Sequence, residues 1–385
     1  MRKLLLLLIG ISVGIGVSYV YFNTSLFSNV EHKVRLVVST VPDRKQVIGF
    51  LPYWLLSKAD KDYENYINTL AYFALAINPD GSIQKFTSPQ ESEPGYFALQ
   101  SGKVTPFLKD AKRNNIQLSL VVFAGDEEHI GQLVRKPTMH AKKLVAEVVP
   151  IMKKYGFTDL NIDVESVREA SESARSNFSR FVSEVQKGIK KTGSTVSIDV
   201  SPTVFIKPYL IDPKAVGAIV DYFIIMGYDF HFSGSYVTGP VAPLSGAGTI
   251  SEFDIETSVS LGKQIIPKEK LILALPLYGY EWETIDTFTR AAVMPESGIA
   301  ASNRRVESLL TTCDNCVVKR EKEAQEPYVV YPDEERGTFH QIFYPDRQSM
   351  LSKVQFAEKN ELGGIALWAL GYEGDTILEP LREYR

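Results

Sequence analysis

The segment D-L-N-I-D-V-E, from Asp159 to Glu165, places an acidic or amide side chain at every second position. Successive side chains of a β-strand point to opposite faces, so these polar side chains would share one face of a strand. That face carries Asp159, Asn161, Asp163 and Glu165. Burying it costs a large desolvation free energy. A purely structural explanation is a solvated edge strand, or a buried network neutralised by basic residues.

The spacing of the last two carboxylates suits proton transfer. Carboxylates two residues apart on a strand lie roughly 7 Å from one another. Their repulsion, together with burial, raises the pKa of at least one of them. A glutamic acid of raised pKa holds a proton near neutral pH and acts as a general acid. Such chemistry suits cleavage of a glycosidic bond, whose leaving oxygen must be protonated. Asp163 and Glu165 are therefore the first candidates for catalysis.

Eight short apolar runs recur along the chain, and the polar segment overlaps the fourth of them. The runs cover residues 47–54, 70–77, 118–124, 160–165, 196–202, 222–229, 271–279 and 364–372. They are short and rich in aliphatic and aromatic residues, which favours strands. Amphipathic stretches of helical length lie between them, at 138–155, 169–191, 253–264 and 348–359. This alternation predicts an α/β fold, a closed (β/α)₈ TIM barrel of parallel strands. Glu165 would then stand at the carboxyl end of its strand, where barrel active sites are built.

One connection is far longer than an ordinary loop between strand and helix. Residues 283–345 separate the seventh run from the eighth and contain three strand-like pieces, at 316–321, 327–333 and 338–344. We therefore predict a small α+β insertion here. Since it follows the carboxyl end of a barrel strand, we expect it to form a wall of a substrate cleft.

The insertion also holds the two cysteines of the chain, Cys313 and Cys316. One CxxC unit supplies only two of the four ligands that a structural zinc site needs. Outside the cytoplasm we expect a local disulfide, with free thiols and then redox catalysis as the alternatives.

The N-terminal segment is unlike the rest of the chain. Arg2 and Lys3 precede an uncharged run that ends at Phe22 and would span roughly 28 Å as a helix. We predict a transmembrane anchor at residues 1–22, with a cytoplasmic N-terminus, and a polar tether at 23–45. A cleaved signal peptide is the alternative. Both place residues 46–385 outside the cytoplasm, either anchored at the cell surface or secreted.

Composition excludes several classes of function. The 42 Lys and Arg residues nearly balance 46 Asp and Glu residues, which leaves a net charge of −4 and argues against binding of nucleic acid. Apolar residues make up 44% and charged residues 23% of the chain, which is typical of a globular protein. Five histidines without an HExxH pattern leave little room for a histidine-built metal site. We expect no metal, no cofactor and a monomer.

The segment YGFTDLNIDVES, at 155–166, resembles the DGxDxDxE signature of glycoside hydrolase family 18. Further segments resemble the same family in the same order: LAYFALAINPDGSI, IIMGYDF, LILALPLYGY and GGIALWALGYEGD. The resemblance covers roughly residues 45–385 and is greatest to the bacterial cell-wall and spore-cortex branch. Four motifs in the right order are more specific than one.

This resemblance implies roles for the polar strand. Glu165 matches the proton donor of the family, and Asp163 matches the residue that holds the acetamido group of the substrate. Tyr228 matches the hydroxyl that positions the acetamido oxygen. The implied mechanism is retaining and substrate-assisted, because the N-acetyl oxygen of the sugar attacks in place of an enzyme carboxylate. An anionic Asp163 that accepts the acetamido N–H would stabilise the positive charge that develops there.

The resemblance also implies a lining for the sugar. Asp229 and Met226 match further parts of the acetamido pocket, and Trp368 matches the aromatic floor, on which the apolar face of a sugar packs. Tyr278 and Phe50 are additional candidates for contact with the sugar. Each of these side chains could instead be a residue of the core.

Three positions depart from the family signature. Thr158 replaces its first Asp, Asp159 replaces its Gly, and Asn161 replaces its middle Asp. An amide does not titrate, so the family's usual sharing of a proton between Asp163 and a neighbouring acid would be lost. We expect Asn161 to hydrogen-bond to Asp163 and orient it. The departures bear on pH optimum and rate more than on reaction class.

Two hypotheses of function remain. The first is hydrolysis of β-1,4 bonds next to N-acetylglucosamine, in peptidoglycan or in chitin-type polymers. The second is a non-catalytic, lectin-like relative that binds the same polysaccharides. Such relatives typically lose the catalytic glutamate, so the presence of Glu165 favours the enzyme.

Overall fold

A computed structural model describes residues 45–166 and 168–384 of the chain. The predicted anchor at 1–22 and all but the last residue of the predicted tether at 23–45 lie outside these residues. Among the residues that are described, no helix combines the length and the apolar character needed to cross a membrane.

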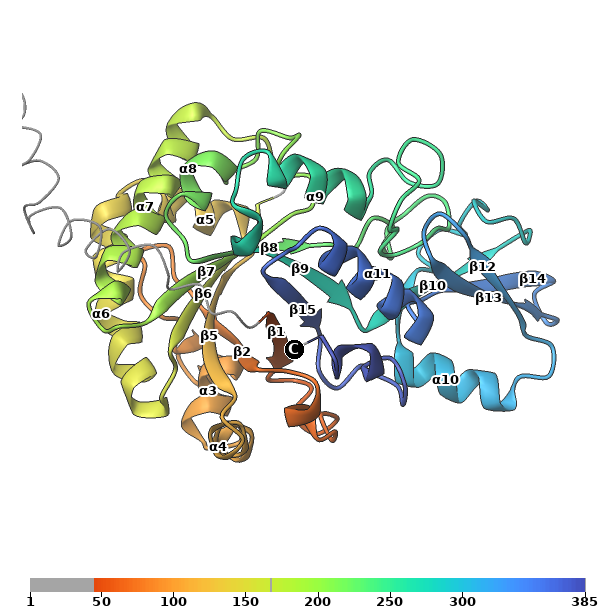
Figure 1. The fold of residues 1–385 in the computed structure, drawn as a ribbon, viewed down its shortest axis with the longest axis horizontal. Coiled ribbons are helices and arrows are strands. Elements are labelled where there is room, and N and C mark those ends of the chain that lie inside the picture. Colours follow the sequence, from red (N-terminus) through yellow and green to blue (C-terminus); the bar gives the residue numbers. More distant parts are fainter. Residues whose placement is uncertain (1–44, 167, 385) are drawn as a thin grey trace, which may run out of the picture. The chain divides into compact units, whose positions relative to one another are not determined.

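Eight parallel strands close into a barrel (Figure 1), as predicted from the eight apolar runs. In order around the barrel they are β1 (Gln46–Pro52), β2 (Thr69–Ala76), β5 (Gln117–Ala124), β6 (Asp159–Val164), β7 (Thr195–Val200), β8 (Tyr222–Met226), β9 (Leu271–Pro276) and β15 (Gly364–Trp368). Each strand overlaps one predicted run. A closed barrel has no edge strand, so β6 is paired on both sides.

Helices cover the outside of the barrel. They are α3 (Pro94–Gln100), α4 (Thr105–Arg113), α5 (Glu127–Leu133), α6 (Pro137–Tyr155), α7 (Glu172–Lys190), α8 (Pro213–Gly217), α9 (Ile255–Lys263) and α11 (Arg347–Lys359). The four predicted helical stretches correspond to α6, α7, α9 and α11. Gly156 caps the carboxyl end of helix α6, and its left-handed φ of 79° suits a glycine. Helix α7 begins after Ser171, whose hydroxyl accepts the N–H of Ala174. A short hairpin, β3 (Phe86–Ser88) with β4 (Glu91–Ser92), follows β2.

The two faces of β6 meet different surroundings. Leu160, Ile162 and Val164 are buried in the apolar layer between barrel and helices, which also holds Phe178 and Phe181 of α7. Full burial of each such side chain contributes about 1.5–3 kcal/mol. The opposite face points into the barrel, and it is the face that carries the polar side chains. The outer layer therefore fixes the register in which those side chains are presented.

The insertion between β9 and β15 is an antiparallel sheet with one helix, and its first strand begins at Tyr278, before the predicted bounds of 283–345. In chain order it comprises β10 (Tyr278–Thr284), β11 (Ile299–Ser302), α10 (Asn303–Thr312), β12 (Val317–Glu321), β13 (Glu326–Asp333) and β14 (Thr338–Phe343). The strands lie in the order β11, β10, β14, β13, β12. Figure 1 shows this sheet and α10 beside the barrel rather than around it. The three strand-like pieces of the sequence are β12, β13 and β14.

A buried ion pair joins the insertion to the barrel. Lys353 of α11 donates to the carboxylate of Glu326 on β13 at 2.6 Å, and the two side chains are 1% and 0% exposed. The same carboxylate accepts the backbone N–H groups of Val241 and Ala242, at 2.9 and 3.2 Å. Glu326 therefore holds together the sheet, α11 and the loop that follows β8.

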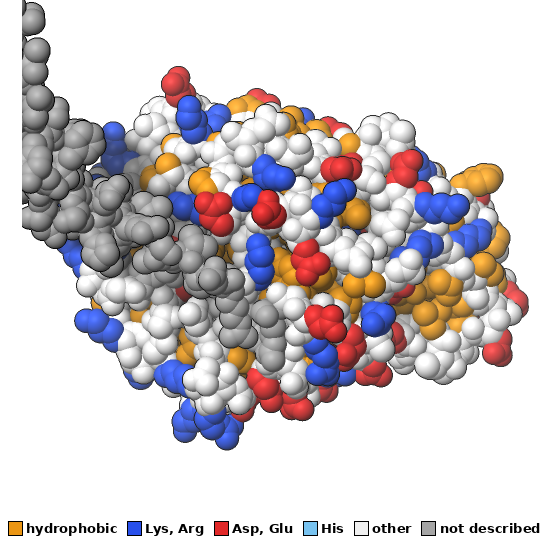
Figure 2. Space-filling model, viewed as in Figure 1, with side chains coloured by type: hydrophobic (Ala, Val, Ile, Leu, Met, Phe, Trp, Pro, Cys, Tyr) orange, Lys and Arg blue, Asp and Glu red, His pale blue; other side chains and the backbone are white. Residues whose placement is uncertain are grey.

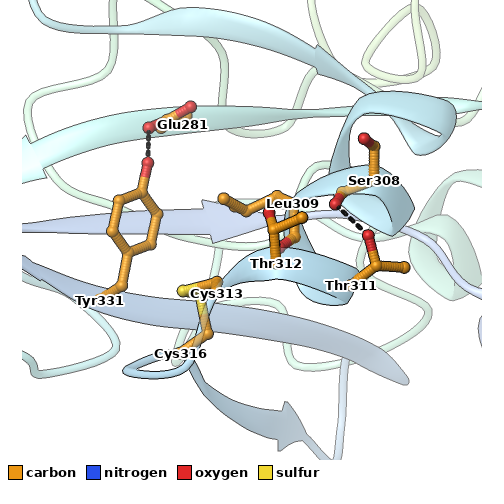
Figure 3. Close-up of a disulfide and its surroundings, with 8 residues drawn as sticks. All are labelled: Glu281, Ser308, Leu309, Thr311, Thr312, Cys313, Cys316 and Tyr331. Atoms are coloured by element: carbon orange, nitrogen blue, oxygen red, sulfur yellow. Dashed lines mark hydrogen bonds between the residues drawn. A yellow bond between two sulfur atoms is a disulfide. The ribbon is translucent and has the colours of Figure 1, made fainter.

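Cys313 and Cys316 form a disulfide, as predicted for this CxxC unit. Figure 3 shows it at the end of α10, beside Leu309 and Thr312. In the same view the Tyr331 hydroxyl points to Glu281, to which it donates a hydrogen bond. On the surface in Figure 2, basic and acidic side chains are interspersed, in keeping with the near-zero net charge.

Candidate active site

The polar face of β6 is buried inside the barrel without a cationic partner. Asn161 and Asp163 are 1% and 3% exposed. In the described part of the chain, no Lys, Arg or His side chain forms an ion pair with Asp163 or Glu165. Neither structural explanation of the pattern holds, since β6 is not an edge strand and its acids are not neutralised by basic residues. The arrangement is one that sites of acid–base chemistry use.

A second buried acid lies on the neighbouring strand. Ile162 of β6 pairs with Ile198 of β7, so the next residues along the two strands are Asp163 and Asp199. Asp199 is 4% exposed. Burial raises the pKa of both carboxyls well above the ordinary value, and the Asp199 and Glu165 charges raise the pKa of Asp163 further. Sequence reasoning missed Asp199, although V-S-I-D-V-S at 196–201 alternates in the same way as β6.

Asn161 does not make the predicted hydrogen bond to Asp163. Its amide donates instead to the Ser197 hydroxyl and to Asp199 Oδ1, both at 3.1 Å. The prediction was wrong because it looked along the strand, where residues two apart lie roughly 7 Å from one another, while adjacent strands lie only about 4.8 Å apart. Among the described residues, Asn161 Oδ1 and Asp163 Oδ1 are buried without a hydrogen-bond partner.

The acid at the amino end of the polar face has its hydrogen-bonding capacity satisfied, in contrast to the acid near the carboxyl end. The carboxylate of Asp159 accepts hydrogen bonds from Ser119, Thr195 and Ser197, at 2.6, 2.6 and 2.8 Å. Unmet hydrogen-bonding capacity is thus concentrated near Asp163, toward the carboxyl end of the strand. Unpaired buried polar atoms are costly, and they call for an explanation in function.

Glu165 follows β6 directly and reaches solvent. Its backbone N–H donates to the carbonyl of Ala124 at 2.9 Å, which continues the β5–β6 ladder by one residue. Its side chain is exposed, yet the protein around the carboxyl and the charge of Asp229 both raise its pKa. A carboxyl that is accessible and also retains its proton to higher pH is suited to protonating a leaving group.

Tyr228 and Asp229 follow β8 and face the same space. Asp229 has a φ of 59°, a left-handed conformation that few residues other than glycine, asparagine and aspartate adopt. Its Oδ1 accepts hydrogen bonds from Tyr278 and, at 3.1 Å, from Tyr280. The surrounding protein raises the pKa of Asp229, and these hydroxyls offset part of that effect. Burial and nearby carboxylates hold the pKa of Tyr228 well above the ordinary value, so its hydroxyl remains a donor.

These side chains line a cavity of about 480 Å³ over the carboxyl end of the barrel. The predicted residues on its wall are Asp163, Glu165, Met226, Tyr228, Asp229, Phe50 and Trp368. Asn161 and Tyr278 lie behind the wall, where they contact Asp199 and Asp229.

The aromatic side of this cavity is centred on Trp368. Its ring lies 4.7 Å from Phe73, 6.0 Å from Phe50 and 6.3 Å from Trp54, all edge to face. Trp54 is 45% exposed, and sequence reasoning did not select it. In the sequence, a tryptophan shortly after the strand that carries Phe50 is a signal that could have identified it.

A second cavity, of about 490 Å³, adjoins the first at Glu165. It shares Glu165, Asp199, Met226, Tyr228 and Asp229 with the first and extends to Phe232 on the loop after β8. Sequence reasoning did not predict it, because loop residues have no periodicity. Glu165 therefore stands where two cavities meet, the position from which a bond spanning both could be protonated.

Comparison with known proteins agrees with this geometry. Residues 42–373 match the model of Glycosyl hydrolases family 18. The chain belongs to glycoside hydrolase family 18. It is 25% identical over 349 residues to the cortical fragment-lytic enzyme of Bacillus anthracis, covering 89% of this chain and 71% of that protein.

Two solved structures share the fold of this family 18 protein. The spore cortex-lytic enzyme SleL of Bacillus cereus has a TM-score of 0.68 at 21% identity, covering 89% of this chain and 74% of that one. A Group IV chitinase of Ostrinia furnacalis has a TM-score of 0.75 at 19% identity, covering 88% and 99%. The barrel, the glycoside hydrolase class and the resemblance to spore-cortex enzymes are confirmed.

Proposed function

We propose that this glycoside hydrolase cleaves β-1,4 bonds next to N-acetylglucosamine by a retaining, substrate-assisted mechanism. The observation that carries the proposal is the pairing of Glu165, accessible and of raised pKa, with Asp163, which is buried and has no cationic partner in the part of the chain that the structure describes. An inverting or two-carboxylate mechanism would need a second accessible carboxylate placed to activate water or attack the sugar. Asp163 is 3% exposed, which favours a role beneath the sugar. Asp229 is accessible, but its Oδ1 is engaged by the hydroxyls of Tyr278 and Tyr280, which disfavours it as the nucleophile or the base.

The first steps follow from where the side chains lie. A sugar that packs on Trp368 would direct its acetamido group into the barrel, toward Asp163 and Tyr228. Glu165 then gives its proton to the glycosidic oxygen. The acetamido oxygen attacks the anomeric carbon as the bond to the leaving group breaks, which forms an oxazolinium ion. Asp163 accepts the acetamido N–H and stabilises the positive charge.

Hydrolysis completes the cycle. Glu165, now ionised, takes a proton from water, and the hydroxide opens the oxazolinium at the anomeric carbon. Two inversions at that carbon give net retention. The Tyr228 hydroxyl would donate to the acetamido oxygen and hold it in line, and Asp229, held by Tyr278 and Tyr280, would face the leaving group near Glu165.

Peptidoglycan is the first polymer to test, and chitin-type oligosaccharides the second. The names of the relatives support this order, since one acts on cortical fragments and another structure is a chitinase. We further propose a monomer that works outside the cytoplasm, either held by residues 1–22 as an anchor or secreted. The disulfide Cys313–Cys316 supports an oxidising compartment.

The test uses the full-length protein and its Glu165→Gln variant, which keeps the shape of the side chain but cannot donate the proton. Release of reducing ends from peptidoglycan and from chitooligosaccharides should fall by at least about 100-fold in the variant. Mass spectrometry of the products identifies the bond, and NMR of the first anomer formed tests retention. Equal, negligible turnover by both proteins with intact binding would instead favour the lectin-like alternative.

A further inference from the structure

Asp199 is a buried acid to which the proposed mechanism gives no task. It is 4% exposed, lines both cavities and has no cationic partner in the described part of the chain. Its Oδ1 accepts an N–H from the side-chain amide of Asn161 at 3.1 Å, so this hydrogen bond engages only one of its two oxygens. A structural aspartate in such a place would normally be satisfied in the way that Asp159 is, by three hydroxyls.

We propose that Asp163 and Asp199 hold a single proton between them, and that Asp199 is a positioning residue that receives it when Asp163 binds the substrate. This inference rests on the proposed function, because the substrate group concerned is the acetamido N–H. The acid that would share a proton with Asp163 is then supplied by β7, across the sheet, instead of by position 161 on the same strand.

Electrostatics supports one proton for the pair. Asp163 and Asp199 each follow directly on the paired residues Ile162 and Ile198, so they lie side by side on adjacent strands. Adjacent strands are about 4.8 Å apart. Two carboxylates so close in a low-dielectric interior do not both ionise near neutral pH. The charges of Glu165 at the rim and of Asp159 on the same face of β6 raise the pKa of Asp199, whereas the hydrogen bond from Asn161 lowers it. Burial and the surrounding carboxylates therefore favour retention of the proton, and only the hydrogen bond from Asn161 to Asp199 opposes it.

Asn161 favours a resting proton on Asp163, because its N–H stabilises the charged form of Asp199. Its N–H donates to Asp199 Oδ1 and to the Ser197 hydroxyl, while Asp163 Oδ1 has no partner among the described residues. A proton on Asp199 Oδ2 would give Asp163 a hydrogen bond and leave it anionic. The transfer is balanced, because one O–H bond on Asp163 breaks, one forms on Asp199, and the reverse occurs when product leaves. Asp163 is then free to accept the acetamido N–H.

The experiment measures kcat and KM across pH for wild type, Asp199→Asn and the double variant Asn161→Asp with Asp199→Asn. The single variant keeps an acceptor for Asn161 but cannot take the proton. We expect kcat to fall by about 10- to 100-fold with little change in KM. The pH limb of kcat that reflects loss of the shared proton should be absent from the single variant, because an amide does not titrate. The double variant returns an acid to the same face of β6, two residues from Asp163, and should restore part of kcat and the limb.

A control variant and a spectroscopic measurement distinguish loss of the shared proton from a general structural effect. Asp159→Asn is the matched control, since Asp159 lines neither cavity. The limb of the shared proton should remain in this variant and shift only slightly, because the charge of Asp159 is the last of the causes that raise the pKa of Asp199. Infrared difference spectra at neutral pH should show one protonated carboxyl fewer in Asp199→Asn than in wild type, whether or not substrate is present.

The outcomes separate this inference from the proposed function. Active wild type with unchanged kcat, pH limbs and infrared band in Asp199→Asn would overturn the shared proton and leave the proposed function standing. Wild type that cleaves neither polymer would overturn the proposed function, while loss of the infrared band would still establish the proton pair. A fall in kcat that the double variant does not relieve, with the band unchanged, would assign Asp199 to structure alone and overturn the inference.

Discussion

Buried carboxylates occur in two regions of this molecule, and they are treated in opposite ways. In the insertion, Glu326 pairs with Lys353 and accepts two backbone N–H groups, while Glu281 contacts Arg305 and Tyr331. In the barrel, Asp163 has no cationic partner among residues 45–166 and 168–384, and its Oδ1 is without a hydrogen bond there. The first region uses each charge to hold elements together. The second keeps its charges apart from any counter-ion.

The difference separates carboxylates that stabilise the fold from carboxylates that destabilise it but are suited to proton transfer. A buried carboxylate with complete partners is a fixed part of the scaffold, and removal of one partner leaves an uncompensated charge. A buried carboxylate whose pKa is raised is a proton reservoir, which is destabilising near neutral pH but useful to an enzyme. Removal of a charge from the insertion should therefore lower stability with little effect on turnover, and removal of a charge from the barrel site should lower turnover without loss of stability.

The largest effect should come from Lys353→Met, which removes the cation from Glu326. We expect a loss of about 3–5 kcal/mol in the free energy of unfolding, because the carboxylate stays buried without its charge partner. Urea denaturation measures it. The double variant with Glu326→Gln should recover much of the loss, and kcat per folded molecule should change little. A single variant as stable as wild type would contradict the assignment of Glu326 to the scaffold.

The matching change in the barrel is Asp163→Asn, which should act in the opposite sense. We expect kcat to fall by about 10²- to 10³-fold, since the neutral amide no longer stabilises the positive charge on the acetamido group. Steady-state kinetics on a chitooligosaccharide measures the change. The fall should occur without any loss of thermal stability at pH 8.

The pH dependence of stability gives the same variant a second test. The folded-state pKa of Asp163 is raised above its unfolded value, so the folded protein binds more protons between the two. Stability is therefore lost as pH rises from about 4, the ordinary value, through the folded pKa. Asp163→Asn removes this penalty, so its melting temperature relative to wild type should be higher at pH 8 than at pH 4. A difference that is constant with pH would mean that Asp163 is ionised throughout.

Much of this organisation was predictable from the sequence. The apolar runs predicted all eight barrel strands, and the alternation in β6 predicted which of its side chains face the interior. Alternation is a property of one strand, however, and it cannot tell which residue of another strand lies opposite. Asp199 and the true partner of Asn161 depend on the register between β6 and β7, set by packing of the outer layer. Trp54 and Phe232 belong to connections, where no periodicity marks them.

An intermediate effect should come from replacing both Cys313 and Cys316 with Ser. The disulfide closes a loop of only four residues, so the chain-entropy estimate gives about 2 kcal/mol of stabilisation. Thermal unfolding with and without reductant measures it, and reductant should shift wild type toward the variant. We expect kcat to be unchanged, because the disulfide lies at the far end of α10 from the residues that line the cavities. Loss of turnover in the variant would show that this tip takes part in the site.

The smallest effect should come from Tyr280→Phe, at the place where the two regions meet. Tyr280 belongs to β10, the first strand of the insertion, but its hydroxyl donates to Asp229 in the barrel at 3.1 Å. Loss of this hydrogen bond costs about 0.5–1.5 kcal/mol, and Tyr278 still holds the same oxygen. The pKa of Asp229 should rise, since a hydrogen bond that favours its charged form is gone. Because that group faces Glu165, we expect a change of about threefold in kcat/KM, largest at acidic pH. An effect equally large at every pH would mean that Tyr280 contacts the sugar itself, and the insertion would then belong to the site rather than to its support.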